Sequence, residues 1–362
     1  MEKNRNLDRV MEPETISKNG ASSKSRMSRG NILSKSKFAL LHVLAGVLMI
    51  LTLTVFGCSG SGGGSYKIKM TTESGGYISL HLTGTGIATI DWGDGSEKVS
   101  LTLHEYRVDF IYTYPSASIR TITINGDMIT GLDCSSEDII SLDVSKNTEL
   151  AYLKCGDYQL TSLDLSKNTA LKMLELGGSQ LTNIDLSKNT ALKSLTISSI
   201  PLITSLDLSK NTELTELSIG GTSLTSLDVS KNIALTELRI GVNQLASLDV
   251  SKNTALLFLN CERNQLTSLD VSKNTALKYL TCNYNQLTNL DLRNNLELFV
   301  LDCESNQLTT NALNALFGTL HSNTINVGVS SKMIFIDSNP GSRDCDRSIA
   351  ESKGWKFEWK RR

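Results

Sequence analysis

The stretch LTSLDVSKNTALKYLTCNYNQ, residues 266–286, is followed by almost the same phrase again, and similar phrases precede it back to about residue 130. The Asp of its Leu-Asp step recurs every 21 residues, apart from one step of 22 where Pro201 lies in an insertion. This Asp column consists of Asp143, Asp164, Asp185, Asp207, Asp228, Asp249, Asp270 and Asp291. A unit this short cannot bury its own apolar face, so we expect about eight 21-residue coils stacked into a solenoid.

Each unit contains the same skeleton twice. Its first half reads L-x-x-L-x-C-x-x-N, from Leu277 to Asn285, which is the leucine-rich-repeat signature. Its second half, from Leu266 to Asn274, repeats the spacing with Val271 in the Cys position. Both halves alternate apolar and polar residues and leave no room for a helix. We therefore predict a mostly β chain whose coils form two parallel sheets.

Residues 130–362 resemble the short, nested leucine-rich-repeat proteins of bacteria, and more narrowly the repeat proteins of Bacteroides-like bacteria. The phrase LDVSKNTAL, which returns with small changes in nearly every coil, carries this resemblance. The resemblance implies a leucine-rich-repeat solenoid over residues 130–310. It also implies a binding scaffold, because such repeats present ligand-specific surfaces on a common fold.

The differences between coils are concentrated at two outward positions in the first half of each unit. One column contains Tyr152, Met173, Ser194, Glu216, Glu237, Phe258, Tyr279 and Val300, and the other contains Lys154, Glu175, Thr196, Ser218, Arg239, Asn260, Thr281 and Asp302. Aromatic and Arg side chains are frequent anchors of binding surfaces. We therefore predict a variable, ligand-binding face, with unselected surface variation as the alternative. The candidate binding residues are Tyr152, Lys154, Arg239, Phe258, Asn260, Arg263, Tyr279, Tyr284 and Phe299.

The second half of each unit is nearly constant. Its stacked Asp side chains would lie about 4.8 Å apart and would repel by roughly 1 kcal/mol per neighbour even in water. Flanking Ser hydroxyls and a Lys column can offset this repulsion, so we expect a self-satisfied polar ladder. A row of cation sites is the alternative, but the glycine turns of a calcium-binding repeat are missing. The Lys column is Lys146, Lys167, Lys188, Lys210, Lys231, Lys252 and Lys273.

An inward column mixes Cys with larger apolar residues. It runs Cys134, Cys155, Leu176, Ile197, Ile219, Ile240, Cys261, Cys282 and Cys303. Because Cys alternates here with Leu and Ile, we expect buried free thiols that act as small hydrophobic residues. Disulfides between coils and a zinc site are the alternatives, although no C-x-x-C motif supports a metal. We predict no metal site and no cofactor.

The repeats are followed by a segment, residues 311–362, with the pattern of a C-terminal α/β cap. Leu313, Leu316, Phe317 and Leu320 share one face of a predicted helix, and the final W-K-F-E-W alternates like a strand. The stretch NPGSRDCDRSIAESKGW, residues 339–355, resembles the cap of the same bacterial family. We expect this segment to cover the apolar edge of the last coil.

Residues 66–129 lack the 21-residue period and contain short alternating strands. The phrase I-D-W-G-D-G-S, residues 90–96, includes the hairpin signal Asp94-Gly95. Together with Y-T-Y at residues 112–114, it resembles the PKD-like β-sandwich, with Tyr112 in the position where that family usually has His. A calcium loop is the alternative for Asp91, Asp94 and Glu97, but its ligand spacing is absent.

The N-terminal 57 residues have the pattern of a cytoplasmic leader and a lipoprotein signal peptide. An apolar run at residues 38–56 follows Lys35 and Lys37 and ends just before Gly57-Cys58. We predict that Cys58 is acylated and anchors the chain to a membrane, with residues 58–65 as a Gly/Ser linker. The run of 19 residues is long enough to span a bilayer, so an uncleaved anchor is the alternative. Met1 and Met27 are both possible starts.

Charge and motifs favour a binding protein over an enzyme or a nucleic-acid partner. Nine of the 36 Lys and Arg residues and four of the 37 Asp and Glu residues precede residue 38, so a chain starting at Cys58 has a net charge of −6. This charge argues against nucleic acid. No metalloprotease, Walker A, nucleophile-elbow or dinucleotide motif is present, so we expect no catalysis. We predict a monomeric lipoprotein of the bacterial outer membrane, with the cell surface as one of its possible locations. Its predicted function is adhesion or recognition through binding of a protein or glycan. A structural spacer of the envelope is the alternative.

Overall fold

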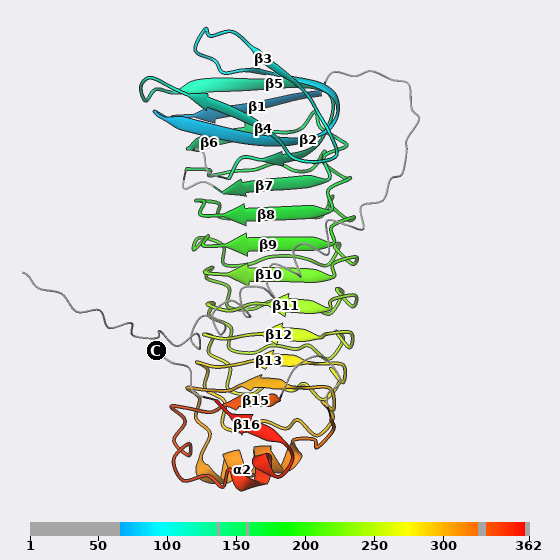
Figure 1. The fold of residues 1–362 in the computed structure, drawn as a ribbon, viewed down its shortest axis with the longest axis vertical. Coiled ribbons are helices and arrows are strands. Elements are labelled where there is room, and N and C mark those ends of the chain that lie inside the picture. The colour runs from blue at the N-terminus through cyan, green and yellow to red at the C-terminus, as the bar shows by residue number, and fades with distance from the viewer. Residues whose placement is uncertain (1–65, 136–137, 157–158, 325–330, 359–362) are drawn as a thin grey trace, which may run out of the picture. The chain divides into compact units, whose positions relative to one another are not determined.

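A computed structural model describes residues 66–135, 138–156, 159–324 and 331–358 of the chain. Residues from Gly63 to Arg362 form one compact unit, in which one long hydrogen-bonded sheet follows the order β16-β15-β14-β13-β12-β11-β10-β9-β8-β7-β5-β1-β6 (Figure 1). The apolar run at residues 38–56 and Cys58 lie outside the described residues. Within them, no helix is both long and apolar enough to cross a membrane.

The repeats form a parallel β-solenoid, as predicted. Each coil contributes one short strand, and neighbouring strands pair in register with their equivalent residues. At the C-terminal end the same sheet continues through β15 (Lys332–Phe335) and β16 (Trp355–Phe357). The strands of the eight predicted coils are β7 (Tyr152–Gly156), β8 (Met173–Gly177), β9 (Ser194–Ser198), β10 (Glu216–Gly220), β11 (Glu237–Arg239), β12 (Phe258–Asn260), β13 (Tyr279–Thr281) and β14 (Val300–Asp302).

Buried asparagines connect each coil to the one before it. Asn253 is fully buried, and its Nδ2 donates to the Val229 carbonyl at 3.0 Å and to the Asn232 carbonyl at 2.9 Å. The backbone carbonyls at the turns, which have no strand partner, are satisfied in this way. The same pair of donations is made by Asn168, Asn189, Asn211, Asn232, Asn274 and Asn295.

The predicted second parallel sheet is not present in the described residues. The constant halves of the coils turn instead of pairing; the exception is β6 (Ile139–Asp143), which pairs antiparallel with β1. In a typical coil, Asp207 Oδ1 accepts the Ser209 N–H at 2.8 Å, and the Asn211 N–H donates to the Leu208 carbonyl at 3.0 Å. Because these groups bond within their own coil, they are not available for a strand ladder between coils. The alternation of apolar and polar residues in the constant halves correctly indicated which side chains are buried. It did not indicate that the backbone there, apart from β6, forms no strands.

The N-terminal strands join the same sheet. These are β1 (Tyr66–Thr72), β2 (Tyr77–Asp91), β3 (Val99–Thr102), β4 (Val108–Thr113) and β5 (Arg120–Asp133). β2 pairs with β3, β4 and β5, and β5 also pairs with β1. The end of β5 then pairs in parallel with β7. One strand therefore crosses the boundary expected between residues 129 and 130, and the buried core runs through both regions.

The W-G-D-G-S segment forms the turn after β2. Asp94 Oδ1 accepts the Ser96 N–H at 3.0 Å, and the Tyr112 hydroxyl donates to Asp94 Oδ2 at 2.7 Å. Interactions with Ser96 first and with the Tyr112 hydroxyl second lower the pKa of Asp94 to about 2. Tyr112 also stacks on Trp92 with ring centroids 4.9 Å apart. The carboxylate of Asp94 is thus engaged in holding the turn.

The C-terminal segment closes the solenoid with α2 (Thr310–Thr319), α3 (Ser348–Glu351), β15 and β16. The Thr309 hydroxyl caps α2 by accepting the Ala312 N–H. Leu313, Leu316, Phe317 and Leu320 are all buried, on the helix face that the spacing predicted. Trp355 is also buried and donates its indole N–H to the His321 carbonyl at 3.0 Å.

Candidate functional site

The two variable columns lie side by side on the outward face of β7–β14, which we call the variable face. In each strand the central Leu is buried, and the residues before and after it are partly exposed except for Asp302, which is buried. The parallel register brings equivalent residues of successive coils next to each other. The face is therefore a regular array in which only the side chains change from coil to coil.

Arg239, Phe258 and Tyr279 form a continuous cluster on three adjacent strands, which we call the aromatic cluster. The Arg239 guanidinium lies 4.5 Å from the centroid of the Phe258 ring, and the Phe258 and Tyr279 rings are 5.7 Å apart. Arg239 also forms an ion pair with Glu237. Burial lowers the pKa of Arg239 and raises the pKa of Tyr279 from their ordinary values. Aromatic rings next to an Arg guanidinium that is fixed by an ion pair are typical of the hot spots of protein–protein interfaces.

Phe299 does not belong to this exposed surface. It is only 3% exposed, and its ring packs edge-on against Tyr279 with centroids 4.5 Å apart. Phe299 directly precedes β14 and packs against Tyr279. We therefore correct its assignment from a ligand-contact residue to a residue that supports the Tyr279 ring. The alternation of the repeat could not show this, because Phe299 lies outside the strand.

Arg263 and Tyr284 lie together but away from the strands of the variable face. Each follows its strand in a turn, with left-handed φ values of 52° and 53°. The Arg263 guanidinium lies 4.3 Å from the Tyr284 ring centroid, and Tyr284 is 44% exposed. Asn260 is on the face, but its Oδ1 accepts the Glu262 N–H at 2.8 Å and shapes the end of β12.

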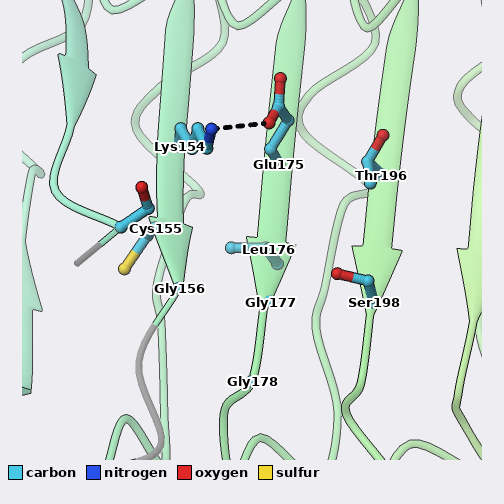
Figure 2. Close-up of a pocket in the computed structure, with 10 residues that line it drawn as sticks. Lys154, Cys155, Gly156, Glu175, Leu176, Gly177, Gly178, Thr196 and Ser198 are labelled. Atoms are coloured by element: carbon cyan, nitrogen blue, oxygen red, sulfur yellow. Dashed lines mark ion pairs between the residues drawn. The ribbon is translucent and has the colours of Figure 1, made fainter. Parts of the chain in front are cut away.

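Tyr152 and Lys154 lie at the opposite end of the variable face from the aromatic cluster. Lys154 pairs with Glu175 on the adjacent strand, with Nζ and Oε2 3.6 Å apart (Figure 2). Burial, more than the nearby carboxylates of Glu175 and Asp133, raises the pKa of Tyr152 well above its usual range. The exposed candidate residues therefore fall into three places: the aromatic cluster, the Arg263–Tyr284 pair and the end of the face at β7. Only the aromatic cluster brings together side chains from three adjacent strands.

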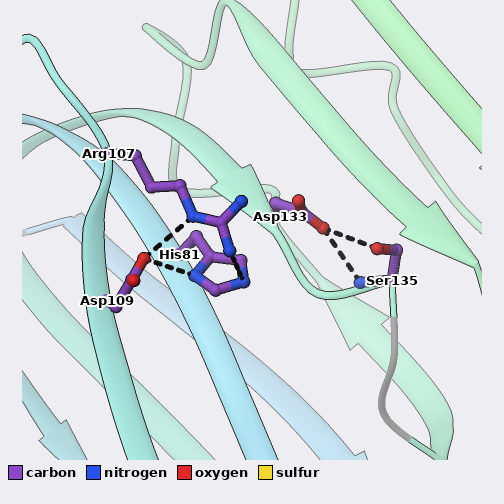
Figure 3. A network of polar contacts seen from close by, with 5 residues as sticks. All are labelled: His81, Arg107, Asp109, Asp133 and Ser135. Carbon is purple, nitrogen blue, oxygen red and sulfur yellow. Dashed lines mark hydrogen bonds and ion pairs between the residues drawn. The ribbon is translucent and has the colours of Figure 1, made fainter. Parts of the chain in front are cut away.

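The variable face continues onto the N-terminal strands, which the repeat pattern did not reveal. Along one cross-strand row, Asp109 of β4 pairs with His81 of β2, His81 with Asp133 of β5, and Asp133 with Lys154 of β7. His81 Nδ1 lies 2.7 Å from Asp109 Oδ1, and Arg107 contacts both residues (Figure 3). A long-range pairing between non-repeating strands leaves no periodic signal in the sequence.

The carboxylates of the Asp column accept local hydrogen bonds. Seven of its members accept the N–H of the Ser two residues later, and Asp291 accepts that of Arg293. Hydrogen bonds lower the pKa of each carboxyl: the side chain of Ser145 or Arg293 is the main donor for Asp143 and Asp291, and the backbone N–H of the Ser for the other six. Among the described residues, no group of three or more His, Cys, Asp or Glu side chains could hold a metal ion. The Asp carboxylates are held by the backbone N–H and the hydroxyl of the Ser two residues later, and the Lys of the same coil adds opposite charge.

The stacked cysteines are free thiols in the described residues, and Cys261, Cys282 and Cys303 are fully buried in successive coils. Burial raises the pKa of Cys261 to about 12, and it also raises the pKa values of Cys282 and Cys303 above the ordinary value of a thiol. Thiols with raised pKa values are poor nucleophiles and poor metal ligands. The column therefore packs like the Leu and Ile residues with which it alternates.

The fold is similar to those of solved bacterial leucine-rich-repeat proteins. The functional domain of InlJ from Listeria monocytogenes, described as including a cysteine ladder, is 34% identical with a TM-score of 0.53; the match covers 61% of this chain and 46% of that one. A leucine-rich-repeat protein of Leptospira interrogans is 20% identical with a TM-score of 0.51, and its match covers 62% and 64%. The chain thus spans less than two thirds of either structure. No protein-family profile and no curated protein matches it.

Proposed function

We propose that this chain is an exported, membrane-anchored recognition protein that binds a protein partner through the aromatic cluster. The observation that carries the proposal is the contrast between the two sides of each coil. The Asp carboxylates and Asn amide N–H groups of the constant side are engaged in hydrogen bonds within the solenoid, whereas the strand side varies between coils and presents Arg239, Phe258 and Tyr279 partly exposed. Variation on a rigid scaffold is typical of a binding surface.

Binding at this surface is tested by a photo-reactive aromatic residue placed at Tyr279 in the producing cells, with Lys252 on the constant side as the matched control. We expect a protein cross-link from position 279 and none from position 252. The substitution at 279 keeps an aromatic ring, so it preserves the cluster it reports on. Cross-links from neither position, or equally from both, would favour the passive spacer of the cell envelope.

Anchoring through an acylated Cys58 is the second part of the proposal, supported by the sequence around that residue. Replacing Cys58 with Ala should move the chain from the membrane fraction to the soluble fraction, since a lipid chain would be lost. A variant that stays in the membrane would show that residues 38–56 remain as an uncleaved anchor. Protease added to intact cells then tells whether the solenoid is on the outer surface, where we place it, or in the periplasm.

A further inference from the structure

A hollow of about 310 Å³ opens on the variable face over β7, β8 and β9 (Figure 2). Lys154, Glu175 and Thr196 lie side by side across its lining, and Ser198, Gly156 and Gly177 line it further along the strands. Its volume is near the lower end of the range of about 300–1,000 Å³ for small-molecule sites. Its nearest strand, β9, is two strands away from β11, which carries Arg239, and four from β13, which carries Tyr279, and its lining includes no residue of the aromatic cluster.

The backbone conformation does not require glycine at Gly156 or Gly177, which line this hollow. Neither Gly156 nor Gly177 is among the residues with left-handed φ. A Cβ on Gly177 would come no closer than 3.3 Å to another atom, the Ser198 Oγ, and a Cβ on Gly156 no closer than 3.4 Å, to the Ser135 carbonyl oxygen. Both glycines end their strands and leave the backbone uncovered there, and glycine in a sheet often marks a place where a ligand approaches the backbone.

The polar groups at the hollow and along the adjoining strands combine donors and acceptors, and they include three carboxylates beside two cationic side chains. Lys154 is paired with Glu175, and Arg107 is paired with Asp109 at 2.8 Å further along the same cross-strand row. Between these pairs, Asp133 accepts hydrogen bonds from the Ser135 N–H and hydroxyl (Figure 3). A phosphate or carboxylate would face these carboxylates at a cost. A ligand rich in neutral hydroxyls could accept from the ammonium and donate to the carboxylate of one ion pair.

We infer that the hollow is a second binding site, which takes a neutral saccharide of one or two rings. The Lys154–Glu175 pair and the Thr196 and Ser198 hydroxyls bind the sugar hydroxyls, and the exposed backbone at Gly156 and Gly177 forms the floor on which the ring rests. The row through Asp133 and His81 extends the polar surface toward the next ring of a longer glycan.

The test uses the detergent-solubilised full chain on a printed array of neutral and charged glycans. Gly177→Leu places a side chain in the hollow, and Gly220→Leu makes the same change in the same row on β10, outside the lining residues. Glu175→Gln removes the charge of the acceptor with almost no change of shape. We expect neutral glycans to bind to the wild type and to Gly220→Leu, with signals at least tenfold weaker for Gly177→Leu and Glu175→Gln.

Three results would overturn the saccharide site: no neutral glycan bound by the wild type, binding confined to charged glycans, or full binding by both variants of the hollow. Equal thermal unfolding midpoints of the two Leu variants confirm that the comparison concerns the hollow. A variant with Phe258→Ser and Tyr279→Ser should keep the glycan signal, so failure of the protein-binding proposal is distinguishable from failure of this one.

Discussion

Replacing Asn253 with Ala is expected to lower the free energy of unfolding by about 3 kcal/mol, at the upper end of ordinary single substitutions. The side chain is fully buried, and it donates two hydrogen bonds to the preceding coil. Each lost bond costs about 1 kcal/mol, and the cavity left by the amide adds to the loss. In a solenoid, such an interface between neighbours carries much of the stability.

The neighbouring residue supplies the control for this prediction. Lys252 is exposed on the constant side, so Lys252→Ala should change the stability by less than about 0.5 kcal/mol. Asn253→Asp should be worse than Asn253→Ala, because a carboxylate would face two carbonyl oxygens. Urea denaturation followed by circular dichroism measures all three. Equal stability of Asn253→Ala and Lys252→Ala would refute the role of the asparagine column.

Replacing both Phe258 and Tyr279 with Ser is expected to weaken protein binding about 100-fold, which corresponds to about 2.7 kcal/mol. The two rings lie 5.7 Å apart; Phe258 contacts Arg239 on one side, and Tyr279 contacts the buried Phe299 on the other. Because they are in contact, their single effects will not add, and the double variant removes the cluster as a whole. Both side chains are only partly buried, so the solenoid itself should remain folded.

The sequence predicted the solenoid because burial repeats with the coil. Leu280 and Cys282 point inward in one coil, and their equivalents do so in the others, so a single period determines the core. The sequence did not predict that the constant halves lack a sheet. Alternation reports which side chains are buried, whereas Asp207 and Asn211 direct the backbone into turns by local hydrogen bonds.

The candidate site was only partly predictable, because alternation gives the direction of side chains only within a strand. Outward positions within a strand, such as Arg239 and Tyr279, follow from alternation and were correctly placed on one face. Phe299 and Arg263 lie beyond the strand ends, where alternation no longer applies, and the structure places them elsewhere. The row through His81 arises from strand pairing over long sequence distances, which no local pattern encodes.

The affinity of the partner cross-linked from position 279 tests the central claim most directly. It should be measured by calorimetry for the wild type, for the Phe258→Ser/Tyr279→Ser variant and for Lys252→Ala, after checking that their thermal midpoints agree. We predict a dissociation constant about 100-fold higher for the double variant and unchanged for Lys252→Ala. A double variant that binds as tightly as the wild type would contradict recognition through the variable face.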